Sequence, residues 1–551
     1  MITLESRSLK YVKRVFVIIA AIFVCRLAFL QIFVHEEYSA NAQSIRTISY
    51  DTSPHRGTIY DRNGVVLAVS VDAMTIYANP CEVTDAKYEA RQLSKVLKGN
   101  ANDYEKLLRT ADTSFVYIKR QIDESVSNKV KELDLDGIYF LEESRREYPN
   151  GSIGGNIIGA VDVDGNGICG LELQYNDILM GTPGVYSAER GLQGTPIPGA
   201  VHENIKAVDG TDIMISIDIT LQDEAEKALE KGLKKNRAKN GSAVVFDPET
   251  GDILAMCSYP YLNPGDLKNS LVGSDNLTCV TQPFEPGSVF KAFSALAVLE
   301  EGALTPKSKL FVPAELEADE YVITDSHDRE DEMMTFSKIL EESSNIGISL
   351  AINKVGFNKL YDTLSKLKFA NATGIDYPGE AKGSLTDVGQ WSKIDGYSIS
   401  FGQAMTATPL QVAYAYGALA NDGYVAQPHF LIALPQTEEW KTYEKEKLLD
   451  DKKSIKTLKK MLRGVVTKGT GKDAYIRGYE VVGKTSTAEI AENGEYAKSR
   501  YNLCFSGFIN NSSSKLVCNV VANNVKQTGN MASAFRDIMV EAIDLYKIVP
   551  E

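Results

Sequence analysis

Ser288 and Lys291 form a Ser-x-x-Lys motif, a pattern that can activate a serine for nucleophilic attack. Pro286 and Gly287 interrupt the chain just before Ser288, and the residues from Val289 onward favour a helix. Ser288 is therefore predicted in the first turn of that helix, with Lys291 on the same face. A desolvated lysine amine can lose its proton near neutral pH and serve as the base that a serine nucleophile needs. The helix N-terminus adds positive potential where an oxyanion would form.

A second polar pair, Ser343 and Asn345, forms a Ser-x-Asn motif further along the chain. The serine hydroxyl can relay a proton, and the asparagine amide can hold a substrate carbonyl. On its own the pattern fits a helix cap or a loop at least as well. The motif becomes informative only if the fold brings it to Ser288.

A third candidate is the run Lys484-Thr485-Ser486-Thr487. The β-branched residues around it predict a strand, and a strand at the rim of a site can pair with an extended peptide. Lys484 could attract a carboxylate, which Thr485 or Thr487 could also bind. The alternative is an ordinary edge strand that carries a solvated lysine.

The same region, from Gly478 to Thr485, matches the phosphate-loop pattern G-x-x-x-x-G-K-[ST]. A phosphate loop follows a strand and opens a helix, whereas the sequence here predicts strand on both sides of Lys484. We therefore disfavour a nucleotide site. The net charge of -14 also argues against nucleic acid as a partner, because phosphate binding needs a basic face.

An acidic loop over residues 315–332 suggests a possible zinc site. It contains Asp325 and His327, and Cys504 lies on the strand predicted to follow the Lys484 strand. Asp, His and Cys are ligand types that zinc takes, and Cys518 could add a fourth. The alternative is a solvated loop above two buried cysteines.

The elements that must position these motifs lie in the second part of the chain. Residues 211–218 alternate as a strand does, and a helix with one apolar face follows. A hairpin is predicted at 241–246 and 253–257, and the chain then reads as mostly helical from 289 to 421. Further strands are predicted at 479–487, 503–509 and 516–522, and a closing helix at 532–546. This order predicts an α+β domain with an antiparallel sheet between helical layers.

Val15 to Val34 is an apolar run long enough to cross a bilayer as a helix. Basic residues precede it and acidic residues follow it, so the positive-inside rule places the N-terminus in the cytoplasm and the rest outside. A cleaved signal peptide is the alternative, but no small-residue cleavage site follows the run. Arg26 within it is costly in lipid and either snorkels or faces a partner helix. We expect a single-pass membrane protein.

The length of 551 residues exceeds what one hydrophobic core supports, so two or three domains are expected. Residues before about 205 alternate extended and helical pieces with glycine-rich turns, which suggests a β-rich module rather than an enzyme core. The seven cysteines are scattered and odd in number, so no disulfide framework is implied.

Together, the three motifs resemble those of class B penicillin-binding proteins. The resemblance extends along nearly the whole chain, because further family motifs occur in the same order. These are Pro54 to Gly64, Arg146-Glu147-Tyr148-Pro149, Gly167 to Glu172, Asp247 to Met256, Gly402 to Gln411, and Gly469-Thr470-Gly471.

The resemblance implies a role for each motif residue. Ser288 would be the acylated nucleophile and Lys291 its base, while Ser343 would relay a proton and Asn345 would hold the substrate. The backbone N–H groups of Ser288 and Thr487 would form an oxyanion hole. Lys484, Thr485, Ser486 and Thr487 would line the substrate-binding strand. Ser486 departs from the glycine usual in the family, which puts the affinity for particular β-lactams in doubt.

The resemblance also implies an organisation and partners. We expect a cytoplasmic tail at 1–14, a membrane helix at 15–34, an extended β-rich pedestal or dimerisation-type module at 35–205, and a transpeptidase domain at 206–551. The protein would cross-link peptidoglycan stem peptides, be acylated by β-lactams and require no organic cofactor. Its expected partners are a glycosyltransferase of the SEDS family and other wall-synthesis proteins.

Two other functions remain as alternatives. A β-lactamase or D,D-carboxypeptidase would share the fold, but the sequence shows no clear glutamate placed to drive deacylation, and turnover of the acyl-enzyme would discriminate them. A scaffold or β-lactam sensor with a dormant site is non-enzymatic, and the complete set of motif residues argues against it.

Overall fold

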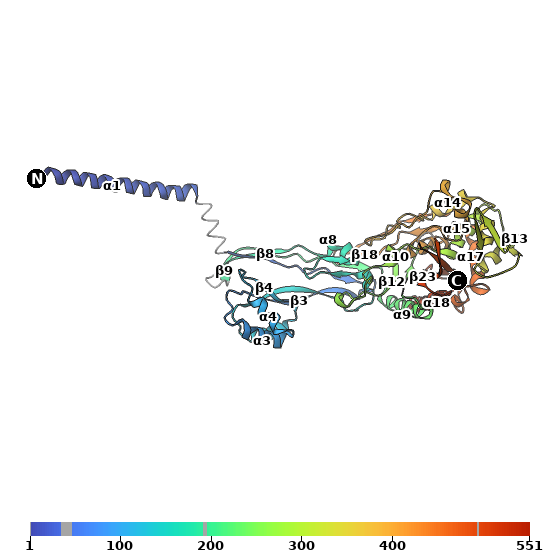
Figure 1. Ribbon diagram of the computed structural model, residues 1–551, viewed down its shortest axis with the longest axis horizontal. Helices are drawn as coiled ribbons and strands as arrows, with labels where there is room; N and C mark the ends of the chain where they lie inside the picture. The colour runs from blue at the N-terminus through green and yellow to red at the C-terminus, as the bar shows by residue number, and fades with distance from the viewer. Residues whose placement is uncertain (1, 35–46, 191–195, 493–494) are drawn as a thin grey trace. The chain divides into compact units, whose positions relative to one another are not determined.

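The computed structural model describes residues 2–34, 47–190, 196–492 and 495–551 (Figure 1). By their internal contacts the residues form two units. One unit comprises residues 1–55 and 181–209, and the other comprises residues 56–180 and 210–551.

The first unit contains the apolar helix α1 (Ile2–Ala28), which ends in a short π-helical turn, η1 (Phe29–Phe33). The segment Leu9–Ile32 is long and apolar enough to cross a membrane, and it is the one such helix among the described residues. The predicted apolar helix is therefore confirmed, although it begins earlier than residue 15. The unit also holds an antiparallel sheet in the order β1-β8-β9. Its strands are β1 (Thr47–Thr52), β8 (Gly184–Arg190) and β9 (Pro196–Ile205).

The N-terminal part of the second unit is built on the long strand β3 (Val66–Ala78), which pairs with two strands, β4 (Val116–Ile122) and β5 (Ile138–Glu147). Helices α3 (Ala86–Leu97), α4 (Ala101–Leu108) and α5 (Glu124–Lys131) close a small apolar core with these strands. The same sheet continues through β2 (Ile59–Tyr60) and β10 (Ile213–Ile215) to β18 (Leu431–Leu434) and β19 (Glu439–Trp440). Short elements follow β5: α6 (Gly155–Ile158), β6 (Ala160–Val161), β7 (Gly167–Cys169), α7 (Gly170–Gln174) and α8 (Asn176–Leu179).

A buried ionic network joins the motif residues of this region. The Glu172 carboxylate accepts hydrogen bonds from Arg56 Nε at 2.6 Å and from Arg146 Nε at 2.7 Å. Arg56 also donates to the Glu172 carbonyl, and Arg146 donates to the Arg56 carbonyl. The three side chains are almost fully buried, so each charge depends on the others for compensation.

The C-terminal part of the second unit is organised around a five-stranded antiparallel sheet in the order β12-β11-β23-β22-β21. Alternating residues face opposite sides of it. One face packs on α9 (Ile219–Asn236) and α18 (Ala532–Tyr546). Helix α18 has the predicted bounds, and α9 is the helix predicted to follow residue 218. The strands are β11 (Asn240–Phe246), β12 (Ile253–Tyr259), β21 (Glu480–Glu492), β22 (Glu495–Asn510) and β23 (Val517–Val525).

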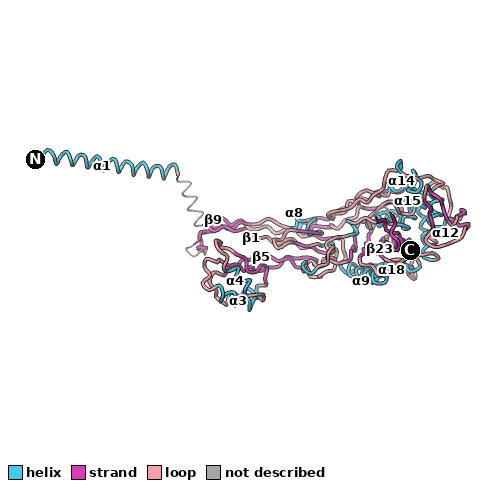
Figure 2. The backbone as a smooth tube through the Cα atoms, viewed as in Figure 1, coloured by secondary structure: helices cyan, strands magenta, loops and turns pink. Residues whose placement is uncertain are grey.

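The other face of the sheet packs on a layer of helices that contains the largest apolar core (Figure 2). These helices are α10 (Thr278–Thr281), α11 (Lys291–Glu300), α12 (Phe336–Glu341), α13 (Asn345–Ile352), α14 (Phe357–Lys366), α15 (Lys393–Ser400), α16 (Pro409–Ala420) and α17 (Lys452–Thr467). The predicted α+β architecture, with an antiparallel sheet between helical layers, is confirmed.

The segment from 289 to 421 is less helical than predicted. Two short antiparallel strand pairs interrupt it between α11 and α12, and one pair is nested within the other. The inner pair lies inside the acidic segment 315–332. Each strand is only four residues long and carries mixed apolar and polar residues, so no sustained pattern marks it in the sequence. The pairs are β13 (Lys309–Val312) with β16 (Glu332–Thr335), and β14 (Glu315–Ala318) with β15 (Tyr321–Thr324). A third short pair joins β17 (Tyr424–Ala426) to β20 (Lys445–Lys447).

Candidate active site

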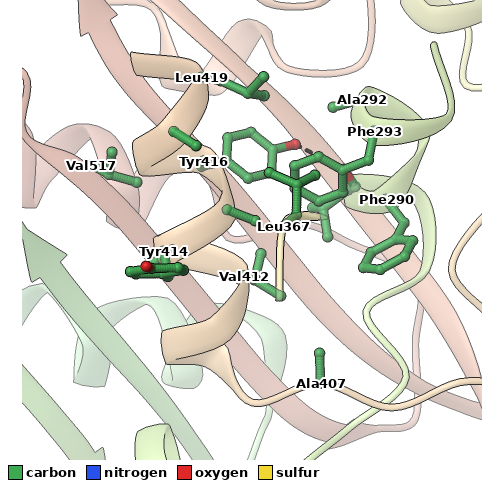
Figure 3. Packing of buried hydrophobic residues seen from close by; sticks show 14 of the residues in the cluster. Phe290, Ala292, Phe293, Leu367, Ala407, Val412, Tyr414, Tyr416, Leu419 and Val517 are labelled. Carbon is green, nitrogen blue, oxygen red and sulfur yellow. Dashed lines mark hydrogen bonds between the residues drawn. The ribbon is translucent and has the colours of Figure 1, made fainter. Parts of the chain in front are cut away.

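Ser288 lies in a 3-10 turn, η3 (Gly287–Phe290), that runs directly into helix α11. Gly287 has a φ of +59° and donates its N–H to the Gly402 carbonyl at 2.8 Å. The next residues anchor the turn in the core: Phe290 packs on Phe369 with ring centroids 4.5 Å apart. Figure 3 shows Phe290, Phe293 and Tyr416 in this core. The Tyr416 hydroxyl donates to the Val289 carbonyl at 2.9 Å. The predicted position of Ser288 at the start of a helix is confirmed.

Lys291 is the first residue of α11 and is completely buried. Its amine donates to the Ser343 carbonyl at 2.5 Å, to Ser343 Oγ at 3.3 Å and to Asn345 Oδ1 at 2.7 Å. The fold therefore brings the Ser-x-Asn motif to the lysine that lies one helical turn from Ser288. This contact converts two separate sequence patterns into one polar cluster.

Ser343 sits in the tight link between α12 and α13 and has a φ of +63°, which is uncommon for a serine. Ser344 caps α13 by accepting the Gly347 N–H at 2.9 Å, and Asn345 is the first residue of that helix. The Asn345 amide nitrogen also donates to the Thr324 carbonyl at 3.0 Å. Two contacts thus fix the Asn345 side chain: it accepts a hydrogen bond from Lys291 and donates one to the last residue of β15.

Lys484 lies on β21, an edge strand of the sheet, and is also completely buried. Its amine donates to Ser343 Oγ at 2.8 Å and to the Thr485 carbonyl at 3.1 Å. Two lysine amines therefore approach one serine hydroxyl. Burial lowers the pKa of Lys484 well below its usual range, and the nearby Lys291 lowers it further.

Burial also lowers the pKa of Lys291 to about 7, although the Asp325 charge opposes that shift. The amine is protonated below this pKa and free above it, so it can accept a proton at physiological pH. We expect the rate of serine acylation by a penicillin to rise as pH increases through about 7 and then to level off. Stopped-flow or quenched acylation with a fluorescent penicillin from pH 5.5 to 9 measures this, and a rate that is flat across that range would contradict a base role for Lys291.

Residues along β21 alternate between the two faces of the sheet. Lys484 and Ser486 face the helical layer, whereas Thr485 and Thr487 face the side of α18. The Thr485 hydroxyl shares a hydrogen bond with the Thr470 hydroxyl at 2.6 Å, and the Thr487 hydroxyl donates to the Gly529 carbonyl at 3.0 Å. The motif Gly469-Thr470-Gly471 therefore contacts β21 on the sheet face opposite to Lys484, through Thr470.

The Ser486 hydroxyl lies against the turn that carries the nucleophile. A side chain at Gly287 would come within 2.5 Å of Ser486 Oγ, so the two residues are in direct contact. The hydroxyl is buried and has no hydrogen-bond partner within the described part of the chain. The residue therefore points toward Ser288's turn and not away from the site.

Replacing Ser486 by alanine should stabilise the protein. Removal of a buried hydroxyl that lacks a partner relieves a desolvation penalty of about 1 kcal/mol. Differential scanning calorimetry of the full-length protein in detergent should show a higher transition temperature for Ser486→Ala, with exposed Ser326→Ala as the matched control. A lower transition temperature for Ser486→Ala would mean that the hydroxyl is satisfied.

The zinc hypothesis is wrong in its geometry. Among the described residues, no three His, Cys, Asp or Glu side chains are grouped to hold a metal. Asp325 is committed to hydrogen bonds with protein donors, and His327 is exposed. Cys504 is buried in the sheet, where Sγ accepts from Asn519 Nδ2 at 3.3 Å. Cys518 faces the opposite side of the sheet, because it lies three residues from Val521, the partner of Cys504.

The phosphate-loop pattern is likewise not a phosphate loop. Gly483 and Lys484 lie within β21, which continues to Glu492, so no helix follows the lysine.

Sequence reasoning also missed the true place of Asp325, which contacts the start of α13 rather than a metal. The only available signal was that Ser344 and Asp325 are both residue types that favour helix N-termini.

The sequence and the fold match known proteins. The family model for the penicillin-binding protein transpeptidase domain matches residues 241–540. The family model for the penicillin-binding protein dimerisation domain matches residues 51–215. The chain is 31% identical to the "Probable peptidoglycan D,D-transpeptidase PbpC" of Pseudomonas aeruginosa, over 97% of this chain and 96% of that protein. It is 30% identical to the peptidoglycan D,D-transpeptidase FtsI of Buchnera aphidicola, over 96% and 93%. A crystal structure of a peptidoglycan synthetase from Bifidobacterium adolescentis superposes with a TM-score of 0.71 at 26% identity, covering 92% of this chain and 98% of that one.

A penicillin-binding transpeptidase domain preceded by a dimerisation domain defines the class of serine acyltransferases to which this chain is similar. The chain belongs to the class B penicillin-binding proteins. Its activity is serine-type peptidoglycan D,D-transpeptidation, which needs no cofactor. Proteins of this class are membrane-bound, and the apolar helix α1 is consistent with such an anchor.

Proposed function

We propose that Ser288 is the nucleophile that forms the acyl-enzyme during transpeptidation. The observation that carries this assignment is the Lys291 amine, which is buried, has a pKa lowered to about 7 and is held by Ser343 and Asn345. Such an amine can take the serine proton when the oxygen attacks. The same chemistry would leave Ser288 acylated by a β-lactam.

The proposed reaction has two acyl-transfer steps. Ser288 Oγ attacks the D-Ala–D-Ala amide carbonyl, and its proton passes to the Lys291 amine. The C–N bond breaks as the proton on Lys291 passes through Ser343 to the leaving D-Ala amine, and the acyl-enzyme remains. The amine of a neighbouring stem peptide then attacks the ester carbonyl, and the C–O bond to Ser288 breaks. The proton that this amine loses passes through Lys291 to Ser288 Oγ, which restores the free serine. Backbone N–H groups of Ser288 and Thr487 would stabilise the oxyanion in both steps.

The substrate side of the site is assigned to β21 and Asn345. An extended stem peptide can add to an unpaired strand edge, and β21 is the edge strand of its sheet. Lys484, Thr485, Ser486 and Thr487 would form this peptide-binding strand. The Thr485 and Thr487 hydroxyls already have protein partners, so carboxylate binding would require those hydrogen bonds to rearrange.

The organisation inferred from the sequence is retained as part of the proposal. It comprises a cytoplasmic tail at 1–14, a membrane helix at 15–34, a pedestal at 35–205 and the transpeptidase domain at 206–551, with the bulk outside the cell. The matches at 51–215 and 241–540 support the division. A glycosyltransferase of the SEDS family is the proposed partner, contacted through the helix and the pedestal.

Acylation of the full-length protein by a fluorescent penicillin tests the nucleophile. Intact mass should show one adduct on the parent and none on Ser288→Ala, because alanine has no hydroxyl. Ser294→Ala offers a matched control, since Ser294 is a buried serine of helix α11, which directly follows Ser288, and donates to the Ser400 carbonyl. An adduct on Ser288→Ala, or no adduct on the folded parent, would contradict the assignment.

The lifetime of the adduct separates a transpeptidase from a hydrolase of the same fold. An acyl-enzyme that persists for hours indicates transpeptidase chemistry, and one that turns over within seconds indicates a β-lactamase or carboxypeptidase. Chasing the labelled protein with unlabelled penicillin measures this lifetime directly.

A further inference from the structure

The carboxylate of Asp325 lies directly against the start of helix α13. One oxygen accepts the backbone N–H of Asn345 at 2.5 Å and that of Ile346 at 3.1 Å. The other oxygen accepts the Ser344 hydroxyl at 2.7 Å. Asp325 therefore contacts three consecutive residues, Ser344 to Ile346. Asn345 is one of the proposed site residues, and Ser343, another, directly precedes the three.

Arg329 holds Asp325 in this position. Its Nε donates to the second Asp325 oxygen at 2.6 Å, and the exposed fraction of the Asp325 side chain is only 8%. The other guanidinium nitrogens donate to the carbonyls of Val312 at 2.9 Å and Pro313 at 2.5 Å. Arg329 thus connects the loop after β15 to the end of β13. These contacts hold the Asp325 carboxylate in place and keep it from turning toward solvent.

This arrangement constrains the residues that touch Lys291. Ser343 has a positive φ, a conformation that persists only where surrounding contacts enforce it. Its neighbour Ser344 is held by Asp325 and by the Gly347 N–H, and the backbone of Asn345 is held by Asp325. The side chains of Ser343 and Asn345 then reach Lys291 from a fixed backbone.

The charges around Lys291 come from two elements. Lys484 approaches from β21, and Asp325 approaches from the loop after β15. Burial would raise the pKa of Asp325, but hydrogen bonds from Arg329 and Ser344 outweigh it and lower that pKa, so the carboxylate is ionised at neutral pH. Its negative charge raises the pKa of Lys291 against the effect of burial.

We propose that Asp325, oriented by Arg329, is the positioning residue that holds Ser343 and Asn345 on the Lys291 amine. It acts through these residues and does not itself touch the substrate. The proposal rests on the proposed function, because it assumes that Lys291 activates Ser288. It also gives the part of the acidic segment 315–332 that lies between β15 and β16 a role in the reaction in place of metal binding.

The test is the acylation rate of full-length Asp325→Asn with a fluorescent penicillin. Asparagine keeps the size of the side chain, but in either orientation its NH2 group faces protein donors where a carboxylate oxygen accepts now. Part of the hydrogen bonding that holds Ser344 and Asn345 is therefore lost. We expect the acylation step to slow by about 100-fold, the effect typical of a misplacement of about 1 Å, with the initial penicillin affinity changed much less. Arg329→Gln leaves the carboxylate but removes its support, and should give a smaller loss.

The pH profile distinguishes positioning beside Lys291 from general damage. Loss of the Asp325 charge lowers the pKa of Lys291, so the rising limb of the Asp325→Asn profile should move to lower pH while its plateau falls. A variant that is merely less stable would lose plateau rate without moving the midpoint. Asp328→Asn is the matched control, since Asp328 is an exposed carboxylate of the same loop.

Several results would overturn the proposal. Acylation of Asp325→Asn within twofold of the parent, or equal losses in Asp325→Asn and Asp328→Asn, would exclude a positioning role. If Asp325→Asn does not fold, parent-like acylation by folded Arg329→Gln would exclude it instead. If the parent protein is never acylated at Ser288, the proposed function is contradicted. If the parent and Asp325→Asn are acylated equally fast, only the positioning role of Asp325 is contradicted.

Discussion

Lys291→Met should lower the rate of Ser288 acylation by about 10²–10⁴-fold, the contribution typical of a positioned general base. Methionine has similar length and fits a buried site, but it cannot accept the serine proton. The loss should persist at high pH, because no amine remains to be deprotonated. Time-resolved intact mass with excess penicillin measures the rate on the full-length protein.

Two controls make the Lys291 result specific. Lys354→Met alters an exposed lysine of the same helical layer and should acylate like the parent. Thermal unfolding should show that Lys291→Met is folded, since the substitution removes three hydrogen bonds but leaves an apolar side chain in a buried site. A folded Lys291→Met that acylates at the parent rate would eliminate Lys291 as the base.

Glu172→Gln should destabilise the pedestal by about 3–5 kcal/mol, the cost of leaving buried charges uncompensated. Glu172 is completely buried and accepts from both Arg56 and Arg146. A neutral amide cannot balance two guanidinium groups. Urea unfolding followed by limited proteolysis between Arg56 and Met180 measures the loss in that part of the chain.

The control for this network is Glu142→Gln, an exposed carboxylate on β5. Its substitution should change the free energy of unfolding by less than about 0.5 kcal/mol. Equal effects of Glu172→Gln and Glu142→Gln would show that the buried network adds little to stability. Acylation of Ser288 should survive in folded Glu172→Gln, because the network does not contact the active site.

The regular elements of the catalytic half were predictable because their periodicity is strong. Helix α9 follows an apolar pattern of about 3.6 residues, and α18 has the predicted ends. Strands β11 and β12 are short apolar runs on either side of a turn, which also marks a hairpin. The four short strands around the acidic loop were missed, because elements of four residues are too short to show a period.

The contacts between motifs were less accessible from sequence. Motif order suggested that Lys291, Ser343 and Lys484 meet, but the two amines that share Ser343 Oγ appear only in the fold. Asp325 shows the limit most clearly. An aspartate close to a histidine in sequence resembles a metal-binding pair. Only the fold shows that the Asp325 carboxylate already accepts backbone N–H groups at the start of α13.

The contact between Gly287 and Ser486 bears on how resistance to β-lactams could evolve in this protein. Position 287 is closed to mutation: its φ is +59°, and an added Cβ would lie 2.5 Å from Ser486 Oγ and 2.6 Å from the Ala488 side chain. Position 486 is open, because a smaller side chain there leaves the backbone unstrained. An antibiotic that contacts the protein where Gly287 meets Ser486 would therefore select substitutions at codon 486 and not at codon 287, next to the nucleophile.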